Sequence, residues 1–311
     1  MSPVVVLPIL LALLPSLPPS WAQGGASFHP RSSHHPVHHE TTAHANNSCR
    51  LRNIAWLHMP KTGTSFGRTL IHCACPASSH KLPVHDSQGR EPFSLISQWA
   101  HPPWNRRGER PREACEGGFD PRHSLLFHEP LPAEVIQDPS SRVVALFRDP
   151  RHRLASSFHY RKLAYGLNQT EWLERQGGMR TAEEYAAFPG IAGCQTRMLA
   201  GYPCASERHP VTSAMLELSL SRMQNLTFVG LTAHWGLTIR LFHAMFGGEC
   251  WEGSWTHLRR GDYDPSLSSA LRPEDDPHDW EVWKAAVKVF KRRLKEFGFP
   301  DEAVRAVRVW G

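Results

Sequence analysis

The sequence contains no apolar run long enough for an ordinary membrane-spanning helix. Residues 4–14 form an apolar stretch, but Pro8 interrupts it, and it is shorter than the roughly 20 residues that a bilayer requires. Small residues follow at Ser20 and Ala22, where a signal peptidase would cut, although no basic residue precedes the stretch. We expect residues 1–22 to be a signal peptide, with an uncleaved signal anchor as the alternative, and we expect membrane association only through this segment.

Zinc-binding spacing and nucleic-acid-binding modules are also missing from the sequence. Cys73 and Cys75 are not followed by a second cysteine pair at a suitable distance. The His-rich residues 23–50 have no apolar periodicity that would scaffold a metal site, which predicts a flexible lumenal stalk. We therefore expect no metal. The net charge of +6 without a nucleic-acid motif predicts an anionic partner other than nucleic acid.

Features that are present indicate the secretory pathway. Asn46, Asn168 and Asn225 each begin an N-glycosylation acceptor triplet. The seven cysteines should mostly pair in an oxidising lumen, and their odd number leaves one over. We favour a pair between Cys194 and Cys204, because a short loop containing Gly and Pro can close it.

Residues 53–75 predict a strand, a tight loop and a helix. Apolar residues lead up to the loop and recur at helical spacing after it. The loop consists of Lys61, Thr62, Gly63, Thr64 and Ser65. Gly63 allows close approach of the backbone to a ligand, Thr64 and Ser65 bring hydroxyls to the helix start, and Lys61 adds a mobile positive charge. The loop is therefore suited to hold an anion.

This loop differs from the phosphate-binding loop of nucleoside triphosphatases in the order of its residues. In that loop the Lys follows the second Gly, whereas Lys61 precedes Gly63. No magnesium-binding partner is evident either, so the order disfavours a secreted nucleotide kinase, which we keep as an alternative.

Residues 142–165 predict a second unit of the same kind. The apolar run at residues 143–147 is typical of a strand buried on both faces. Arg148 and Asp149 end the run, and Pro150 stands where it can begin a helix. Residues 51–311 are long enough for a single large α/β domain, with a central parallel sheet flanked by helices.

The two loops resemble those of sulfotransferases that use 3′-phosphoadenosine 5′-phosphosulfate. Residues 60–65, PKTGTS, are similar to the family's 5′-phosphosulfate-binding loop. Residues 148–156, RDPRHRLAS, are similar to its R-D-P-x-x-R-x-x-S motif for the 3′-phosphate. The resemblance implies a P-loop-like sulfotransferase fold over residues 51–311 and 3′-phosphoadenosine 5′-phosphosulfate as co-substrate.

The same resemblance implies a role for each matching residue. Lys61 to Ser65 would bind the phosphosulfate, and Lys61 would also assist the chemistry. Arg148 and Ser156 would bind the 3′-phosphate, and Arg153 fills the family's inner Arg position. The candidate donor site is thus expected at the ends of two neighbouring strands.

A catalytic base is expected shortly before the second motif. In several carbohydrate sulfotransferases the base follows a strand at a similar point, and residues 124–127 predict a short strand that emerges at His128. An imidazole with an ordinary pKa near 6.5 accepts a proton from a sugar hydroxyl at lumenal pH. We expect His128 to be the base, with Glu129 as the alternative, and expect His58 only to line the site.

Later segments resemble Golgi carbohydrate sulfotransferases, most closely those of the heparan sulfate 6-O and 2-O type. The stretch around Gln195, Thr196 and Arg197 is similar to one in the 6-O enzymes, and these three side chains are expected to face donor or acceptor. The implied activity is sulfuryl transfer to a hydroxyl of a carbohydrate or proteoglycan in the Golgi lumen. Alternatives are an inactive glycan-binding protein with the same fold and a tyrosyl-protein sulfotransferase.

Residues 279–297 predict a long amphipathic helix. Its apolar residues are expected to face the core, and its basic residues are expected to face outward, either as a solvated surface or as a surface for an anionic polymer. The outward residues are Lys284, Lys288, Lys291, Arg292 and Lys295.

Overall fold

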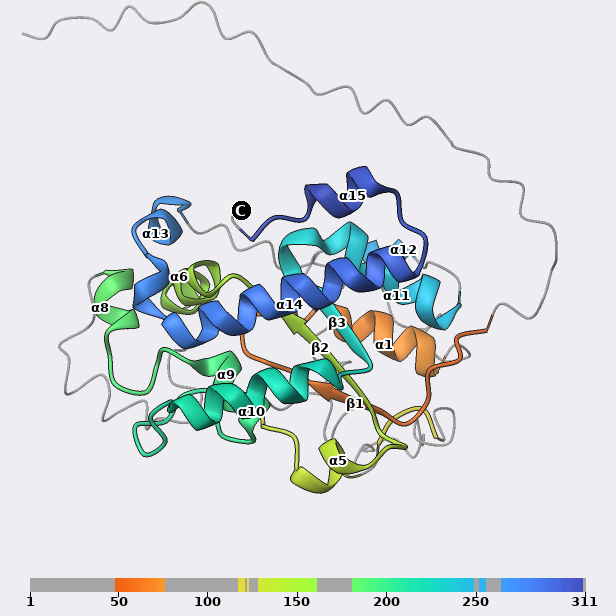
Figure 1. The fold of residues 1–311 in the computed structure, drawn as a ribbon, viewed down its shortest axis with the longest axis horizontal. Helices are drawn as coiled ribbons and strands as arrows, with labels where there is room; N and C mark the ends of the chain where they lie inside the picture. Colours follow the sequence, from red (N-terminus) through yellow and green to blue (C-terminus); the bar gives the residue numbers. More distant parts are fainter. Residues whose placement is uncertain are drawn as a thin grey trace, which may run out of the picture. The chain divides into compact units, whose positions relative to one another are not determined.

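The computed structural model describes one mixed α/β unit in which helices flank a parallel sheet (Figure 1). Every described residue belongs to a compact unit that spans Ala45–Gly311. The described residues are 48–75, 117–120, 122, 128–160, 181–248, 252–255 and 264–309. The α/β class and the parallel sheet that the sequence predicts are confirmed within these residues.

Helices connect the described strands, and further helices follow the last of them. Their bounds are β1 Ile54–Leu57, α1 Phe66–Ala74, α5 Ala133–Gln137, β2 Arg142–Phe147, α6 Pro150–Tyr160, α8 Ala182–Ala186, α9 Cys194–Ala200, α10 Ser213–Gln224, β3 Phe228–Leu231, η1 Thr232–His234, α11 Trp235–Phe246, α12 Glu252–Trp255, α13 Ser266–Ser269, η2 Pro273–Asp275, α14 Pro277–Glu296 and α15 Asp301–Ala306.

The described sheet has the strand order β1-β2-β3, and both pairs of strands are parallel. β2 is the central strand, and its residues after Arg142 are all buried, as expected for a strand covered on both faces. Because the strands are parallel, the loops that follow β1 and β2 lie at the same edge of the sheet. The fold therefore brings the two predicted anion-binding loops together.

Aromatic side chains pack one side of β3 against two helices. The Phe66 ring of α1 stacks on Phe228 of β3 with centroids 5.7 Å apart, and Phe242 of α11 meets both rings edge to face. Edge-to-face and offset contacts are favourable for aromatic rings in a core. These contacts fix the start of α1, and with it the loop that precedes α1.

The long helix α14 lies across the sheet and packs against β3, α9, α10 and α15 (Figure 1). The sequence predicts this helix at residues 279–297, and the structure confirms it at Pro277–Glu296. The predicted inward residues Trp283, Val287, Phe290 and Leu294 are all buried.

Local contacts set the ends of several elements. β3 begins at Phe228, because the N–H groups of Asn225 and Leu226 close the last turn of α10. The predicted helix after Pro150 begins at that residue and is described as far as Tyr160. The strand predicted at residues 124–127 lies outside the described residues.

Two disulfides join described cysteines. Cys194 pairs with Cys204, which confirms the favoured pair, and Cys49 pairs with Cys73 on α1. Cys75 is also disulfide-bonded. These bonds indicate an oxidising compartment of the secretory pathway or the cell exterior.

Candidate functional site

The loops after β1 and β2 are joined by a direct hydrogen bond. The Arg148 guanidinium, which follows β2, donates from Nη1 to the carbonyl oxygen of Lys61 in the first loop at 3.0 Å. Both side chains are half-buried. The two sequence motifs, far apart along the chain, therefore meet at the carboxyl edge of the sheet, where α/β folds usually bind ligands.

The first loop has an unusual backbone conformation. Lys61 has φ 66° and Gly63 has φ 108°, which places both residues in a region that favours glycine. Within the part of the chain that the structure describes, the N–H groups of Gly63, Thr64 and Ser65 donate to no protein atom. Consecutive N–H groups beside left-handed residues, at the start of a helix, form a concave site for an anion.

Hydroxyl groups hold the carbonyl side of this loop. The Thr62 hydroxyl donates to the Met59 carbonyl at 2.8 Å, and the Thr232 hydroxyl donates to the Thr62 carbonyl at 2.6 Å. Thr232 stands directly after β3, so all three described strands support the loop. These bonds engage carbonyl oxygens of the loop and none of its N–H groups.

Two further contacts place side chains of the loop. The Thr64 hydroxyl lies 3.0 Å from Nε2 of His58, and the Lys61 ammonium lies 3.9 Å from the ring centroid of Tyr160 on α6. A cation over an aromatic face is attracted by the ring quadrupole. His58 thus positions Thr64, which is more than the lining role that the sequence suggests.

A glutamine side chain clamps the second loop. Gln195 of α9 accepts from the Arg148 N–H at 3.1 Å and donates to the Arg148 carbonyl at 3.0 Å. This paired bond fixes the backbone from which the Arg148 side chain extends. Asp149 does not pair with Arg148; its carboxylate accepts from the N–H and the guanidinium of Arg151 at the start of α6.

The expectation that Gln195, Thr196 and Arg197 face a donor or acceptor is corrected by these contacts. All three side chains are buried and bonded to protein groups. Acidic side chains at the start of α14 hold α9 in place. Gln195, Thr196 and Arg197 therefore bond to other protein groups around the site and do not face a ligand.

The acidic side chains that hold α9 are Asp276 and Asp279. The N–H groups of Gly193 and Gln195 donate to Asp276 and Asp279 at 2.8 and 2.9 Å, respectively. The Arg153 guanidinium lies 3.6 Å from the first carboxylate and 3.7 Å from the second. Burial, then the negative charge of Asp279, raises the pKa of Asp276 to about 8, despite Arg153.

The predicted residues on α6 are both buried. Arg153 is buried within the carboxylate pair, so the structure gives it a supporting position. Ser156 is buried in α6, and no hydrogen bond within the described residues joins it to Arg148. A role for Ser156 in binding the 3′-phosphate stays a prediction.

His128 lies against His58 beside the first loop. Its Nδ1 is 2.9 Å from the His58 carbonyl, and the two rings are 4.2 Å apart. Because a carbonyl oxygen only accepts, Nδ1 carries the proton, and Nε2 carries the lone pair of the neutral ring. Glu129, the alternative base, is exposed.

The surroundings of His128 favour its neutral form. Burial lowers the pKa of His128 from 6.5, and the nearby Lys61 charge lowers it further, while the bond to the His58 carbonyl opposes this shift in part. A neutral imidazole with its lone pair on Nε2 is able to accept a proton at lumenal pH. The role of His128 as the base stays a prediction, and its neutral form is the one that this role requires.

Sequence reasoning did not identify Thr232 or the clamping function of Gln195. Thr232 follows the apolar strand β3 directly. That position could have identified it, because the carboxyl ends of parallel strands converge. Gln195 gives no such signal, since its function depends on how α9 docks against the second loop.

Within the described residues, no group of three or more His, Cys, Asp or Glu side chains is placed to hold a metal ion. None of the described helices has the length and apolarity that crossing a bilayer requires. Comparison with protein-family models, with curated proteins and with solved structures yields no match to this chain.

Proposed function

We propose that the chain is a sulfotransferase, with a sulfotransferase fold, that transfers a sulfuryl group from 3′-phosphoadenosine 5′-phosphosulfate to a glycan hydroxyl in the Golgi lumen. The observation that carries this proposal is the hydrogen bond between Arg148 and the Lys61 carbonyl. It joins the loop that carries these amide donors to a guanidinium, and the proposed donor carries an anionic group at each end of its ribose.

Donor binding would divide between the two loops. The N–H groups of Gly63, Thr64 and Ser65, with Thr62 shaping the loop and Lys61 adding charge, suit the phosphosulfate. Arg148, with Ser156, would bind the 3′-phosphate, because a guanidinium donates two parallel bonds to a phosphate. This second contact would distinguish the donor from ATP.

The transfer step follows from the position of His128. Nε2 of His128 would take the proton of the acceptor hydroxyl as that oxygen forms a bond to sulfur. The bond between sulfur and the bridging oxygen breaks, and its electron pair leaves with the 5′-phosphate of adenosine 3′,5′-bisphosphate. Lys61 and the amide donors would stabilise the charge that develops on the leaving oxygens.

The first experiment is calorimetric binding of adenosine 3′,5′-bisphosphate to the purified lumenal chain, wild type beside Lys61→Ala and Arg148→Ala. We expect tight binding by wild type, loss in both variants and poor competition by ATP. A folded wild type that does not bind the nucleotide would overturn the proposal, and it would favour an inactive glycan-binding protein.

Catalysis is tested separately from binding. With a panel of glycan acceptors, we expect His128→Ala to bind the nucleotide as wild type does but to lose about 10²–10⁴-fold in rate, the usual contribution of a general base. Because the pKa of His128 is lowered from 6.5, the wild-type rate should fall only on the acidic side of that value. If Glu129→Gln loses rate and His128→Ala does not, the base is Glu129. If sulfuryl transfer occurs only to a tyrosyl peptide, the acceptor is a protein tyrosine and not a glycan.

A further inference from the structure

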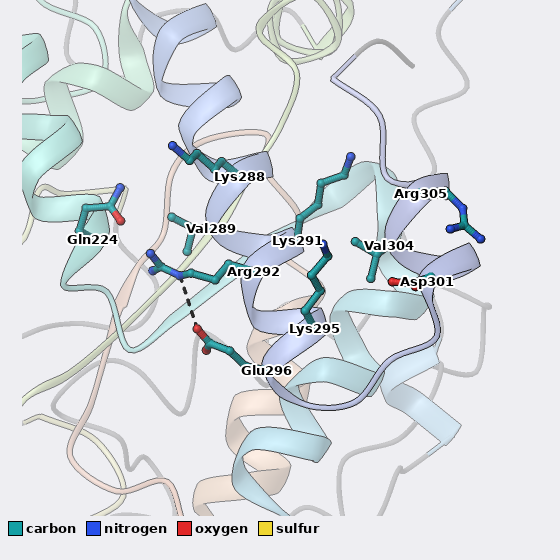
Figure 2. Close-up of a pocket in the computed structure, with 10 residues that line it drawn as sticks. All are labelled: Gln224, Lys288, Val289, Lys291, Arg292, Lys295, Glu296, Asp301, Val304 and Arg305. Carbon is teal, nitrogen blue, oxygen red and sulfur yellow. Dashed lines mark ion pairs between the residues drawn. The ribbon is translucent and has the colours of Figure 1, made fainter.

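A basic groove lies between α10, α14 and α15 (Figure 2). Its volume is about 960 Å³. Gln224 at one side ends α10 just before the amino end of β3, whereas the two anion-binding loops follow the carboxyl ends of their strands. The groove is therefore a separate place from the candidate donor site. It is lined by Gln224, Lys288, Val289, Lys291, Arg292, Lys295, Glu296, Asp301, Val304 and Arg305.

Positive charge predominates in this groove, since five of the lining residues are basic and two are acidic. Glu296 forms ion pairs with two arginines, since its carboxylate lies 2.8 Å from Arg293 and 3.6 Å from Arg292. Arg305 likewise lies 3.4 Å from Glu302. The net positive charge of the groove therefore comes from its lysines.

Lys288, Lys291 and Lys295 are the lysines concerned. Within the part of the chain that the structure describes, none of them lies within 4.0 Å of a carboxylate. Lys284, on the same helix outside the groove, does pair with Glu281 at 2.6 Å. The cations of α14 that have no carboxylate partner therefore gather on the side that faces the groove (Figure 2).

The spacing of these lysines suits a ligand with repeated charges. Positions 288, 291 and 295 are three and four residues apart, so they share one edge of α14 and rise by about 5 Å from each to the next. The buried side chains of Val289 and Val304 lie among them. The charges run in a row and do not converge on one point, as they would for a single phosphate.

We propose that this groove binds an acidic polysaccharide, whose sulfate or carboxylate groups follow the row of lysines along α14. The polymer supplies anionic groups at regular intervals, and the amide of Gln224 offers hydrogen bonds to sugar hydroxyls. This binding is independent of sulfuryl transfer, since no residue of the groove belongs to the candidate donor site.

The disulfides and the shape of the groove favour a polysaccharide over the other common polyanions. An oxidising compartment disfavours nucleic acid. A membrane surface is bound by helices whose large apolar side chains project beside the basic ones, whereas the apolar residues that line this groove are two buried valines.

The test is titration of the chain with heparin, as a soluble sulfated polysaccharide, at low and at raised salt. We expect the triple variant Lys288→Ala, Lys291→Ala, Lys295→Ala to bind about tenfold more weakly or worse, since each exposed pair contributes modestly and all three are lost. The salt dependence should also become shallower, because salt screens exposed charges. The corresponding triple Lys→Arg variant keeps the charges and should bind as wild type does.

The matched control is Arg142→Ala, Arg208→Ala, Arg240→Ala, which removes three exposed positive charges outside the groove. It should bind heparin as wild type does, and all variants should keep the wild-type melting temperature. An equal loss in this control would show attraction by net charge alone and would overturn the proposal. The proposal would also be overturned if the wild-type chain does not bind heparin, or if it binds vesicles of anionic phospholipid and not heparin. None of these outcomes depends on nucleotide binding, which the triple Lys→Ala variant should retain.

Discussion

The loops after β1 and β2 both end a buried strand and both lead into a helix, yet their backbones are used differently. In the first loop, hydroxyl groups bond to the carbonyl oxygens of Met59 and Thr62, and the N–H groups of Gly63, Thr64 and Ser65 have no acceptor among the described residues. In the second loop, Gln195 and Asp149 take up the N–H groups of Arg148 and Arg151. The group proposed to meet an anion at this loop is the side chain of Arg148, which also donates to the Lys61 carbonyl.

The proposed anion site is thus built in two different ways at one sheet edge. The first loop depends on backbone conformation, so it needs glycine and a few direct supports. The second depends on one guanidinium, so its backbone must be fixed by a series of contacts that leads from α14 through α9 to Gln195. Substitutions that break these supports should therefore affect the two loops separately.

The largest effect should come from the buried support of the second loop. Asp279→Ala removes the acceptor of two backbone N–H groups and one hydroxyl and leaves Asp276 as the one acidic residue beside Arg153 among the described residues. We expect a loss of about 3–5 kcal/mol in the free energy of unfolding, as for other broken buried ion pairs. Urea unfolding measures this loss. The control is Asp301→Ala at an exposed position, which should lower the free energy of unfolding by no more than about 1 kcal/mol. A loss as small as that of the control would show that α9 does not depend on Asp279.

Gly63→Ala should come next, and it affects the first loop. A Cβ at this position would lie 3.1 Å from Trp235 and 3.3 Å from Leu146, with φ at 108°. We expect affinity for adenosine 3′,5′-bisphosphate to fall about a hundredfold, with about 1–3 kcal/mol of strain in the folded chain.

Gly298→Ala is the matched control for this substitution. Gly298 has φ 73°, but nothing lies within 4 Å of the added Cβ. The alanine therefore has the same kind of backbone strain without a steric clash, at a position outside the candidate site. If both variants bind the nucleotide equally well, the first loop does not hold it.

The paired variants Gln195→Leu and Thr232→Val sharpen the comparison. Each leaves buried backbone groups without a partner, at a cost of about 1–3 kcal/mol. Gln195→Leu should weaken binding of adenosine 3′,5′-bisphosphate but leave binding of adenosine 5′-phosphate unchanged, because only the Arg148 loop is loosened. Thr232→Val should weaken binding of both nucleotides. Equal losses in both variants would mean that the loops do not act separately.

The last prediction concerns the pH dependence of stability. The pKa of Asp276 is raised from 3.8 to about 8, so the folded chain holds a proton there that the unfolded chain releases above 3.8. This contribution to stability is fully present below 3.8 and is lost as the pH rises through about 8.

Asp276→Asn is the test of that contribution. The amide oxygen still accepts from the Gly193 N–H, but the side chain does not titrate. Urea midpoints measured from about pH 5 to about pH 8 should decline less steeply for the variant than for wild type. Parallel declines would show that Asp276 does not retain the proton.

The strands and both loops were predictable because apolar runs and turn residues mark them locally. Residues 143–147 are a buried strand, and Pro150 begins a helix, as local sequence indicates. The direction of side chains beyond the loops was not predictable in the same way. Gln195 was expected to face a ligand, and it faces the Arg148 backbone instead, because the docking of α9 is set by contacts with α14.

His128 illustrates the same limit at the candidate site. Its position after an apolar run suggested a base, but the sequence did not reveal the acceptor of its Nδ1 proton, the His58 carbonyl. The pairing of Cys194 with Cys204 was predictable because a short loop joins them. The pairing of Cys49 with Cys73 depends on how the chain enters the fold, and local spacing did not reveal it.

The disulfide between Cys49 and Cys73 also has a mechanical consequence. The closed ring of chain between these cysteines, which are 24 residues apart, contains β1 and the whole first loop. A pull applied from the N-terminal side of Cys49 would pass through the sulfur atoms to the end of α1 and would bypass that ring. If residues 1–22 do tether the chain to a membrane, tension on the tether would leave the anion-binding loop unloaded.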